Sequence, residues 1–460
     1  MAVTPPLRVA IVGAGPAGFF LADKLLGQSG IPVAVDLFER LPVPYGLVRF
    51  GVAPDHEKIK NVTRSFDKVA AKPGFRYFGN VEVGRHVSID ELRRHHHAIA
   101  FTTGAQSDRR MGIPGEDLIG SHAATEFVAW YNGHPDFCDA RFDLGVERVA
   151  VVGIGNVAID VARILSRSPE ELATTDIADH ALEALAQSRI REVVLLGRRG
   201  PAQAAFTTPE VKELGELVHA DALARGDEVA LDPLSARMLT DDANERRKLE
   251  ILTDYAGRQP TGKPKRLLLR FLVSPTELIG DEQGRVKAIR ITRNRLVEKD
   301  GALIAEPTGE IEEIPVGLVF RSVGYRGVPI PGLPFDERRA IVPNAGGRVL
   351  DPATGATVPG LYVAGWIKRG PSGVIGTNKP DAGETADAIL ADAAGEVLAD
   401  PPEPSPDGIA ALLESRQPEL VTWTHWQKIA EHEVARGKPV GRPRSKLTRV
   451  ADMLKAALGK

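Results

Sequence analysis

Residues 7–20 read Leu-Arg-Val-Ala-Ile-Val-Gly-Ala-Gly-Pro-Ala-Gly-Phe-Phe. The apolar run Val9–Val12 predicts a buried strand that leads into Gly13-x-Gly15-x-x-Gly18, and a helix is expected from Phe19 to Leu26. In this setting the first glycine allows a tight turn, the second lets backbone approach a pyrophosphate, and the third lets helix and strand pack closely. We therefore expect a dinucleotide at the helix N-terminus, where free N–H groups and the helix dipole favour phosphate. A glycine-rich turn without a ligand is the alternative.

The next predicted strand covers residues 33–39 and ends in an acid, Glu39. In dinucleotide-binding folds a carboxylate about 20 residues beyond the glycines accepts hydrogen bonds from ribose hydroxyls. Glu39 is predicted to have this role. A solvated strand end is the alternative.

A second fingerprint occupies residues 148–165, of which residues 148–158 read Arg-Val-Ala-Val-Val-Gly-Ile-Gly-Asn-Val-Ala. Alanine is an accepted variant at the third position of the motif. Two strand–turn–helix units predict two dinucleotide sites, or a duplicated fold in which one site is inactive. The residues expected to meet the second pyrophosphate are Gly155, Asn156, Val157 and Ala158.

The second strand of this second unit, residues 192–197, ends in Arg198 and Arg199 where an NAD site would place an acid. A helical insertion over residues 169–187 explains the long distance from the glycines. Two guanidinium groups offer forked donors and positive charge to a 2′-phosphate. The arginine pair therefore predicts selectivity for NADP, with a solvated basic strand end as the alternative.

The composition describes an ordinary globular chain of 460 residues with a net charge of −3, long enough for two or three domains. A charge near zero gives no general argument for nucleic acid or a membrane surface. The single cysteine, Cys138, excludes an internal disulfide and a CxxC pair. Three adjacent histidines, 95–97, cannot all face one site on a strand, so no metal is expected.

The expected location is the cytoplasm. The first strand begins by Val9, which leaves no room for a signal peptide, and no apolar run is long enough to span a bilayer. A soluble protein without a membrane span follows from these two expectations.

Other stretches predict further elements. Residues 40–56, with three prolines, are expected to be an apolar loop that lines a site. A helix beginning near Ala205 would place Glu210 and Glu213 on one face. The remaining expectations are helices at 57–71 and 241–256, strands at 76–78, 81–83, 97–104, 316–320, 360–366 and within 267–295, a helix to about 393, and a linker at 400–408.

The chain resembles the adrenodoxin reductase type of ferredoxin–NADP reductase, and especially its bacterial members, over nearly its whole length. In addition to the two glycine motifs, the matching stretches are Gly46-Leu-Val-Arg-Phe-Gly-Val-Ala-Pro-Asp-His-Glu-Lys-Ile-Lys60, Gly197-Arg-Arg-Gly-Pro201, Arg321-Ser-Val-Gly-Tyr-Arg326 and Gly365-Trp-Ile-Lys-Arg-Gly-Pro-Ser-Gly-Val-Ile-Gly-Thr-Asn378. The last is the most specific, because Trp366 stands where most flavin disulfide reductases have Asp. The missing CxxC argues against the thioredoxin reductase branch.

The resemblance implies an α/β fold of two Rossmann-like dinucleotide-binding domains, as in glutathione-reductase-like flavoproteins. The NADP domain is inserted into the FAD domain. Residues 1–108 and 325–460 would form the FAD-binding domain, and residues 109–324 the NADP(H)-binding domain. The first fingerprint would then hold FAD and the second NADP(H).

The resemblance also implies roles for single residues. His56 and Glu213 are expected near the nicotinamide and the flavin, Arg110 and Glu210 at NADP, and Arg246 and Arg247 on a helix that binds the partner protein. The residues expected at FAD are Gly13, Ala14, Gly15, Pro16, Gly18, Glu39, Leu47, Val83, Trp366, Gly373, Val374 and Ile375. Gly373–Ile375 would open a helix whose dipole stabilises negative charge on reduced flavin.

Structural alternatives exist for several of these residues. His56 could be a hydrogen-bonded loop histidine, and Glu210 and Glu213 could complement the dipole of their helix. Arg246 and Arg247 could belong to a solvated helix face.

The expected activity is that of a ferredoxin–NADP reductase. A hydride passes from NADPH to FAD, and single electrons then pass to a small acidic ferredoxin. The enzyme is expected to act as a monomer. The alternatives are an NADPH-dependent flavin monooxygenase and a flavoprotein electron-transfer subunit of a larger complex.

Overall fold

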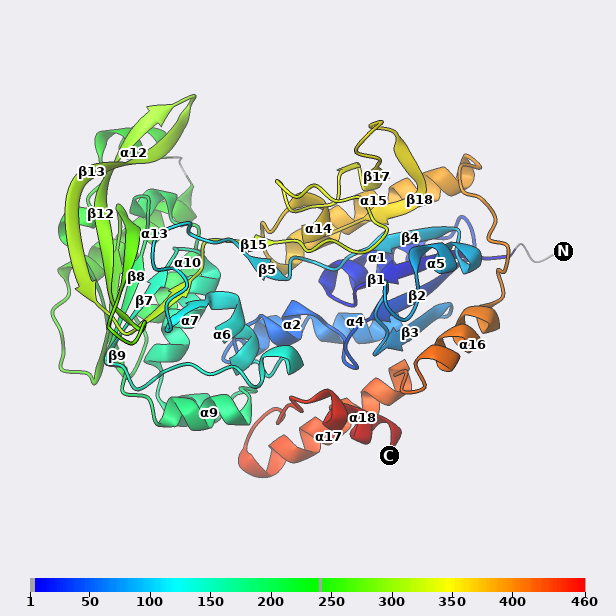
Figure 1. Ribbon diagram of the computed structural model, residues 1–460, viewed down its shortest axis with the longest axis horizontal. Helices are drawn as coiled ribbons and strands as arrows, with labels where there is room; N and C mark the ends of the chain where they lie inside the picture. Colours follow the sequence, from blue (N-terminus) through cyan, green and yellow to red (C-terminus); the bar gives the residue numbers. More distant parts are fainter. Residues whose placement is uncertain (1–4, 240–241, 460) are drawn as a thin grey trace. The chain divides into compact units, whose positions relative to one another are not determined.

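The computed structural model describes residues 5–239 and 242–459 (Figure 1). Its described residues form two compact units. The first unit comprises the chain up to Val52, His56–Ser107, and the chain from Gly324 onward. The second comprises Ala53–Asp55 and Asp108–Val323. Each unit contains a largely parallel sheet of its own, as dinucleotide-binding folds require.

The first unit is built on a seven-stranded sheet in the order β16-β17-β18-β4-β1-β2-β3. Strand β1 is buried along its whole length, and Val9 pairs in parallel with Val35 of β2 and Ala98 of β4. A continuous apolar run is expected of a strand covered on both faces. The strands are β1 (Leu7–Val12), β2 (Val33–Glu39), β3 (Phe75–Gly79), β4 (Ala98–Phe101), β16 (Asn344–Ala345), β17 (Arg348–Leu350) and β18 (Thr357–Val363).

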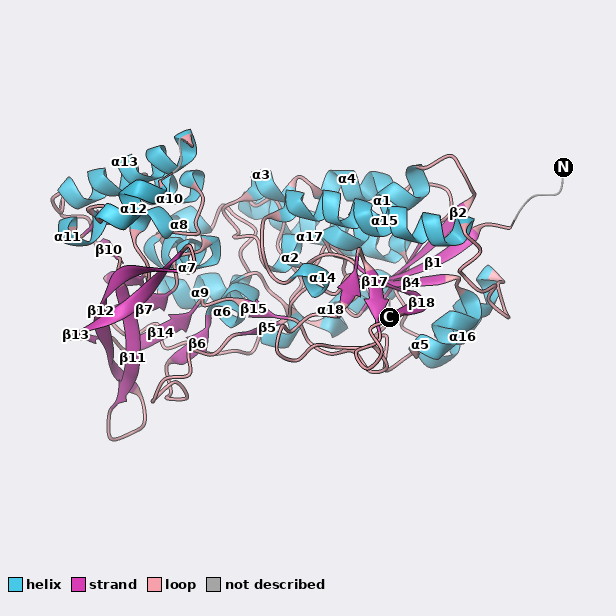
Figure 2. Cartoon of the chain, turned by 90° about the horizontal axis from the view of Figure 1, so that it is seen from above, coloured by secondary structure: helices cyan, strands magenta, loops and turns pink. Residues whose placement is uncertain are grey.

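Helices cover both faces of this sheet, with α1, α4 and α15 on one side and α5 and α16 on the other (Figure 2). Val9 and Ile11 belong to the core that contains Phe19 of α1, whereas Ala10 and Val12 belong to the core that contains Leu92 of α5. The helices are α1 (Pro16–Gly27), α2 (Leu47–Phe50), α3 (Glu57–Lys60), α4 (Thr63–Ala70), α5 (Ile89–His95), α14 (Trp366–Arg369), α15 (Asn378–Ala394), α16 (Pro406–Arg416), α17 (Trp423–Gly437) and α18 (Val450–Leu458).

The second unit is built on a six-stranded parallel sheet in the order β6-β14-β7-β8-β10-β9. Val149 of β7 pairs with Val193 of β8. The strands are β6 (Ser121–Ala123), β7 (Arg148–Val152), β8 (Glu192–Leu196), β9 (Ala220–Ala224), β10 (Lys265–Arg270) and β14 (Leu318–Arg321).

A three-stranded antiparallel sheet packs against one face of this parallel sheet. Val152 and Leu196 meet Leu278 and Ile289 in one apolar core. The antiparallel strands are β11 (Val273–Gly280), β12 (Val286–Lys299) and β13 (Ala302–Pro315). The helices of the unit are α6 (Ala124–Tyr131), α7 (Asn156–Ser166), α8 (Pro169–Leu172), α9 (Asp179–Ala186), α10 (Thr208–Leu214), α11 (Gly226–Val229), α12 (Pro233–Met238) and α13 (Ala243–Gly257), and two short strands, β5 (Ser107–Asp108) and β15 (Tyr325–Arg326), complete the chain.

Two expectations about local structure were wrong. The segment 40–56 is not a loop throughout, because Leu47–Phe50 form the short helix α2, whose side chains Val48 and Phe50 are buried. Its prolines lie outside these four residues and therefore do not block the turn. Residues 81–83 form no strand, because the chain turns back at Gly84 and only an isolated bridge joins Val83 to Val87.

Most other expected elements are present with shifted ends. The helix expected over 57–71 is divided into α3 and α4, and the linker expected over 400–408 ends where Ser405 caps α16. Residue 241, where a helix was expected to begin, lies outside the described residues, and α13 begins at Ala243. Among the described residues, no helix combines the length and apolar character that crossing a bilayer requires.

Candidate functional site

The glycine turn after β1 is closely packed at Gly13 and Gly18 and open at Gly15. Gly13 has a φ of +111°, and a Cβ there would lie 2.7 Å from the carbonyl oxygen of Thr102. A Cβ at Gly18 would lie 2.2 Å from the carbonyl oxygen of Gly13. At Gly15, by contrast, the nearest atom to an added Cβ is the Cα of Gly46, 4.0 Å away. Gly13 and Gly18 therefore allow the tight turn and the close packing of the helix, and Gly15 leaves the N-terminus of α1 approachable.

Glu39 fastens this turn to the next strand. One carboxylate oxygen accepts a hydrogen bond from the backbone N–H of Ala14 at 3.0 Å, and the other accepts one from Leu41 at 3.1 Å. Burial raises the pKa of the Glu39 carboxyl. The residue thus lies beside the turn, at the end of β2, where a ribose is expected.

The C-terminal part of the chain meets the same turn. Gly365 has a φ of +78°, and a Cβ there would lie 2.7 Å from the Cβ of Ala17. The indole N–H of Trp366 donates to the carbonyl oxygen of Ser372 at 3.1 Å, and its ring lies 5.2 Å from that of Tyr325. The sequence reasoning did not single out Tyr325, although it lies inside a stretch that carries the family resemblance.

An exposed segment, residues 372–374, comes after α14 and leads into α15. Gly373 has a φ of +78°, Val374 is 54% exposed, and a short 3₁₀ turn, Ile375–Thr377, precedes the helix. Gly373–Ile375 therefore lie at the N-terminal end of a helical stretch. Their backbone N–H groups are near the positive end of its dipole.

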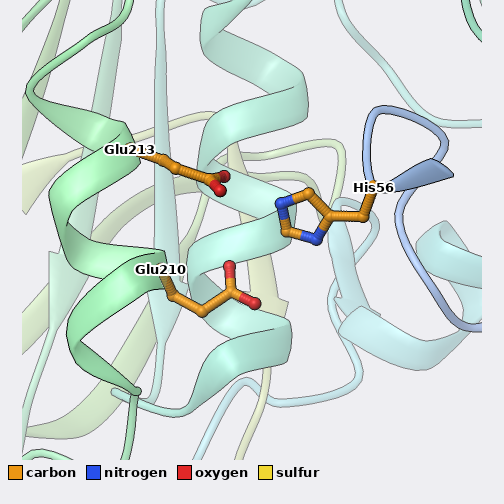
Figure 3. A group of neighbouring side chains, drawn as sticks. All are labelled: His56, Glu210 and Glu213. Atoms are coloured by element: carbon orange, nitrogen blue, oxygen red, sulfur yellow. The ribbon is translucent and has the colours of Figure 1, made fainter. Parts of the chain in front are cut away.

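Three further residues expected near the flavin, Leu47, His56 and Val83, lie in the first unit. Leu47 begins α2 and is 38% exposed. His56 caps α3, where its carbonyl oxygen accepts a hydrogen bond from the backbone N–H of Ile59 at 3.1 Å. Figure 3 shows the His56 side chain. Val83 is half-buried in the turn before Val87.

The second glycine turn, after β7, repeats the geometry of the first. Gly153 has a φ of +131°, and a Cβ there would lie 2.2 Å from the carbonyl oxygen of Ser322. No atom lies within 4 Å of a Cβ added at Gly155. Asn156 begins α7, and its side-chain oxygen accepts a hydrogen bond from the backbone N–H of Thr207 at 2.9 Å. The N-terminus of α7 is thus open to an anion, while Ala158 is fully buried.

Arg198 and Arg199 follow β8 and have exposed side chains. Their carbonyl oxygens accept hydrogen bonds from the side chain of Asn294 at 2.8 Å and the backbone of Leu272 at 3.1 Å. Asn294 is only 3% exposed and also donates to the hydroxyl of Ser274 at 2.8 Å. Sequence reasoning missed Asn294, since an asparagine inside a predicted strand carries no local sign of its partner.

Arg110 lies apart from β8 in the chain. Its exposed guanidinium donates to the carboxylate of Asp117. Arg110 therefore forms an ion pair with Asp117, which belongs to the same loop.

Glu210 and Glu213 project from one face of α10 (Figure 3). Within the second unit, the fully buried guanidinium of Arg163 donates to Glu210 at 3.1 Å, to Asp55 at 2.7 Å and to Asp160 at 2.7 Å. The carboxylate of Glu213 lies 3.6 Å from the same guanidinium. Burial raises the pKa of the Glu210 carboxyl, an effect that Arg163 opposes and Glu213 reinforces.

Arg163 was not predicted from the sequence. Burial by itself lowers the pKa of its guanidinium, but the carboxylates of Asp160 and Asp55 outweigh this and raise it. A buried arginine with several carboxylates is fully charged and fixes their positions. The only local sign was an Asp–Arg pair, three residues apart, in the otherwise apolar residues 157–165 of α7.

Arg246 and Arg247 are exposed on α13, as a docking surface requires. Arg247 donates to Glu250 at 2.7 Å on the same helix. This pair lowers the net positive charge of the helix face.

Comparison with known proteins identifies relatives over the whole chain. Residues 7–196 match the family of pyridine nucleotide-disulphide oxidoreductases. The chain is 48% identical to the NADPH-ferredoxin reductase FprA of Mycobacterium tuberculosis, over 99% of this chain and 100% of that protein. It is 42% identical to the human mitochondrial NADPH:adrenodoxin oxidoreductase, over 97% of this chain and 91% of that protein.

A solved structure gives the same result. The structure of Mycobacterium tuberculosis FprA in complex with NADPH superimposes with a TM-score of 0.92 at 48% identity, covering 99% of this chain and 100% of that chain. This chain and the solved one are therefore similar in sequence as well as in fold.

Proposed function

Because the chain belongs to the adrenodoxin reductase-type family of ferredoxin–NADP reductases, we propose that it oxidises NADPH through bound FAD and reduces a ferredoxin. The observation that carries this proposal is the 48% identity to an NADPH-ferredoxin reductase along the full length of both chains. It favours the reductase over the monooxygenase and over the subunit of a larger complex. FAD supplies the chemistry, since it accepts two electrons with a hydride and gives them up one at a time.

We propose that the first unit holds FAD. The groups that fit it are the N–H groups at the N-terminus of α1, which would donate to the pyrophosphate, and the Glu39 carboxylate, which would accept from ribose hydroxyls. The open space at Gly15 supports close approach. Trp366 and Gly373–Ile375 would border the flavin from the C-terminal side. There the N–H groups before α15 would stabilise negative charge on the ring system.

We propose that the second unit holds NADP(H). The N-terminus of α7, with Gly155 and Asn156, would take the pyrophosphate, and Arg198 and Arg199 would take the 2′-phosphate. Asn294 supports this role by fixing the backbone of Arg198. Arg110 would contribute positive charge from its own loop.

We propose that His56 and Glu213 orient the nicotinamide and the flavin and that no proton transfer is obligatory for the hydride step. Glu210 would act with Arg163 to hold α10 and α7 together within the second unit, because its carboxylate is bonded to that guanidinium. It would thereby support the nucleotide site as well as contact NADP.

We propose that the ferredoxin is acidic and docks on α13 through Arg246 and Arg247, whose exposure supports this assignment. Opposite charges on two partners accelerate their encounter.

We further propose that the enzyme acts in the cytoplasm as a monomer. Static light scattering of the holoenzyme tests the monomer.

An anaerobic titration of the purified, FAD-loaded protein with NADPH tests the proposed function. We expect the flavin absorbance to bleach with NADPH far more readily than with NADH, and a ferredoxin from the same source to reoxidise it. A protein that consumes oxygen rapidly and hydroxylates an organic substrate would contradict the proposal. A protein that binds no FAD would also contradict it.

A further inference from the structure

A short turn before α2 adopts a strained backbone next to the first glycine motif. Tyr45 has a φ of +86°, which is uncommon for a residue with a side chain, and Gly46 has a φ of +49°. The N–H of Tyr45 donates to the carbonyl oxygen of Ala14 at 2.8 Å, and a Cβ at Gly46 would lie 3.1 Å from the Cα of Gly15. Residues 45–50, here called the 45–50 turn, therefore pack directly on the glycine motif. Strain of this kind persists only where surrounding contacts hold it.

The contacts that hold the 45–50 turn come from the other end of the chain, residues 423–447, here called the C-terminal arm. The guanidinium of Arg49 donates to both carboxylate oxygens of Glu433 on α17, one of them at 2.9 Å. The side chain of Arg49 is 3% exposed and that of Glu433 is fully buried. Lys446 donates to the carbonyl oxygen of Arg49 at 3.2 Å. The C-terminal arm therefore holds both the side chain and the backbone of Arg49 in place.

The aromatic side chain of the turn is held by the same arm. The indole N–H of Trp426 donates to the hydroxyl of Tyr45 at 3.4 Å, and the two rings meet edge to face at 5.5 Å. The hydroxyl of Tyr45 in turn donates to Asp67 of α4. The side chain of Tyr45 therefore cannot rotate away from the turn without losing partners on both α17 and α4.

Glu433 is the centre of this arrangement. Besides Arg49 it accepts a hydrogen bond from the backbone N–H of Leu447 at 2.9 Å and lies 3.4 Å from the guanidinium of Arg444. Burial by itself raises the pKa of the Glu433 carboxyl, but Arg49, Arg444 and the backbone N–H of Leu447 together outweigh it and lower that pKa. The carboxylate is therefore charged and joins both halves of the arm to the turn.

We propose that the C-terminal arm positions the 45–50 turn for FAD, with Glu433 as the positioning residue that acts through Arg49. This inference rests on the proposed function, which assigns FAD to the first unit. Leu47, the residue of the turn expected at FAD, begins the helical turn that contains Arg49. A shift of Arg49 would move Leu47 together with the backbone beside Gly15. It would weaken the binding of FAD without removing any residue that contacts FAD.

The test measures the rate at which FAD leaves the holoenzyme. The release of FAD is monitored as the recovery of flavin fluorescence. We expect Glu433→Gln to release FAD about tenfold faster or more, the effect of losing one charge-assisted hydrogen bond. The matched control is Glu228→Gln, which breaks an equally buried pair with Arg270 inside the second unit. It should lower thermal stability and leave FAD release unchanged. Equal FAD release from Glu433→Gln and the wild type would contradict the inference.

A double variant, Arg49→Met with Glu433→Gln, separates positioning from general stability. Removing both charges of a buried ion pair commonly restores stability, and the amide oxygen that replaces the carboxylate can still accept from the backbone N–H of Leu447. We expect the double variant to melt close to the wild type as apoprotein but to release FAD faster. Full recovery of FAD retention along with stability would show that the pair is merely structural. A wild-type protein that binds no FAD would instead contradict the proposed function itself.

Discussion

Arg198 and Arg199 are two exposed side chains whose backbone is fixed by Asn294 and Leu272. The fixed backbone holds the two side chains at one position, and the planar, preorganised fork of each guanidinium loses less entropy per hydrogen bond to a phosphate than a lysine would. The coenzyme preference of the enzyme should therefore depend on these two residues.

Replacing both by alanine should lower affinity for NADPH about 100-fold, since each charge-assisted hydrogen bond contributes roughly 1.5–3 kcal/mol. Affinity for NADH should change little, because NADH has no 2′-phosphate. The measurement is KM for both coenzymes. Arg191→Ala is the control. Arg191 is also exposed, but it precedes β8 and therefore lies at the end of the strand opposite to Arg198 and Arg199. An unchanged ratio of NADPH to NADH affinity would exclude this role.

Gly373 is a second position where one residue decides the local geometry. Any side chain there meets a backbone φ of +78°, and its Cβ would lie 2.4 Å from the hydroxyl of Thr377. Gly373→Val should therefore displace the segment before α15. We expect flavin reduction by NADPH to slow by at least about tenfold, because hydride transfer depends steeply on alignment.

Stopped-flow absorbance of the flavin measures this effect. Gly376→Ala is the matched control, because a Cβ there meets no atom within 4 Å. An unchanged rate in Gly373→Val with full FAD content would remove the proposed role of this glycine.

At the scale of elements, strand β2 is joined to its neighbours by one buried carboxylate. Asp36 accepts hydrogen bonds from Arg8 at 2.9 Å and Arg76 at 2.6 Å, and it lies 2.8 Å from Nε2 of His96. Burial by itself raises the pKa of Asp36, but His96 and Arg76 outweigh it and lower the pKa to about 2. The cluster also explains one of the three adjacent histidines as a partner of this strand.

This lowered pKa predicts a defined pH dependence of stability. Because the pKa of the folded state is below the ordinary 3.8, the stabilisation is present above about pH 4 and is lost as the pH falls toward 2. The difference corresponds to about 2 kcal/mol. The urea midpoint of Asp36→Asn should lie below that of the wild type near pH 6, and the two midpoints should approach each other only as the pH falls from 4 toward 2. A constant difference at all pH values would contradict the assignment.

Helix α13 is the element proposed for docking. Reversing both charges, Arg246→Glu with Arg247→Glu, should slow ferredoxin reduction on the order of tenfold at low salt, as expected when electrostatic steering is lost. Reduction of ferricyanide should stay unchanged, since a small dye needs no docking surface. The control is Lys287→Glu with Lys299→Glu, which reverses the same number of exposed charges on β12. Equal losses with ferredoxin and dye would exclude docking on α13.

At the scale of the whole molecule, the first unit is assembled from both ends of the chain. Strand β18 lies beside β4 in parallel, with Leu361 opposite Ile99, and Gly365 packs on Ala17 of α1. The C-terminal arm then returns to the 45–50 turn, so Arg49 and Glu433 are 384 residues apart in sequence. The proposed FAD site therefore depends on both the N-terminal and the C-terminal parts of the first unit.

The sequence by itself determined those features that depend on neighbouring residues. Both glycine turns were predicted with their strands and helices, because backbone freedom and apolar runs act over a few residues. The family was also identified from short stretches such as Gly365–Asn378, and the comparisons confirm it. Helix α2 was missed, since prolines nearby suggested a loop and the burial of Val48 and Phe50 is a tertiary effect.

Only the tertiary structure decided which polar side chains meet. Arg163 with Glu210, Asn294 with Arg198, and Arg49 with Glu433 are each separated by many residues, from 47 to 384. Each pair is buried or partly buried, and a charged or polar residue in an apolar stretch shows only that some partner must exist. Which partner it meets is decided when the sheets are formed and the helices pack on them, and a local pattern contains no record of that choice.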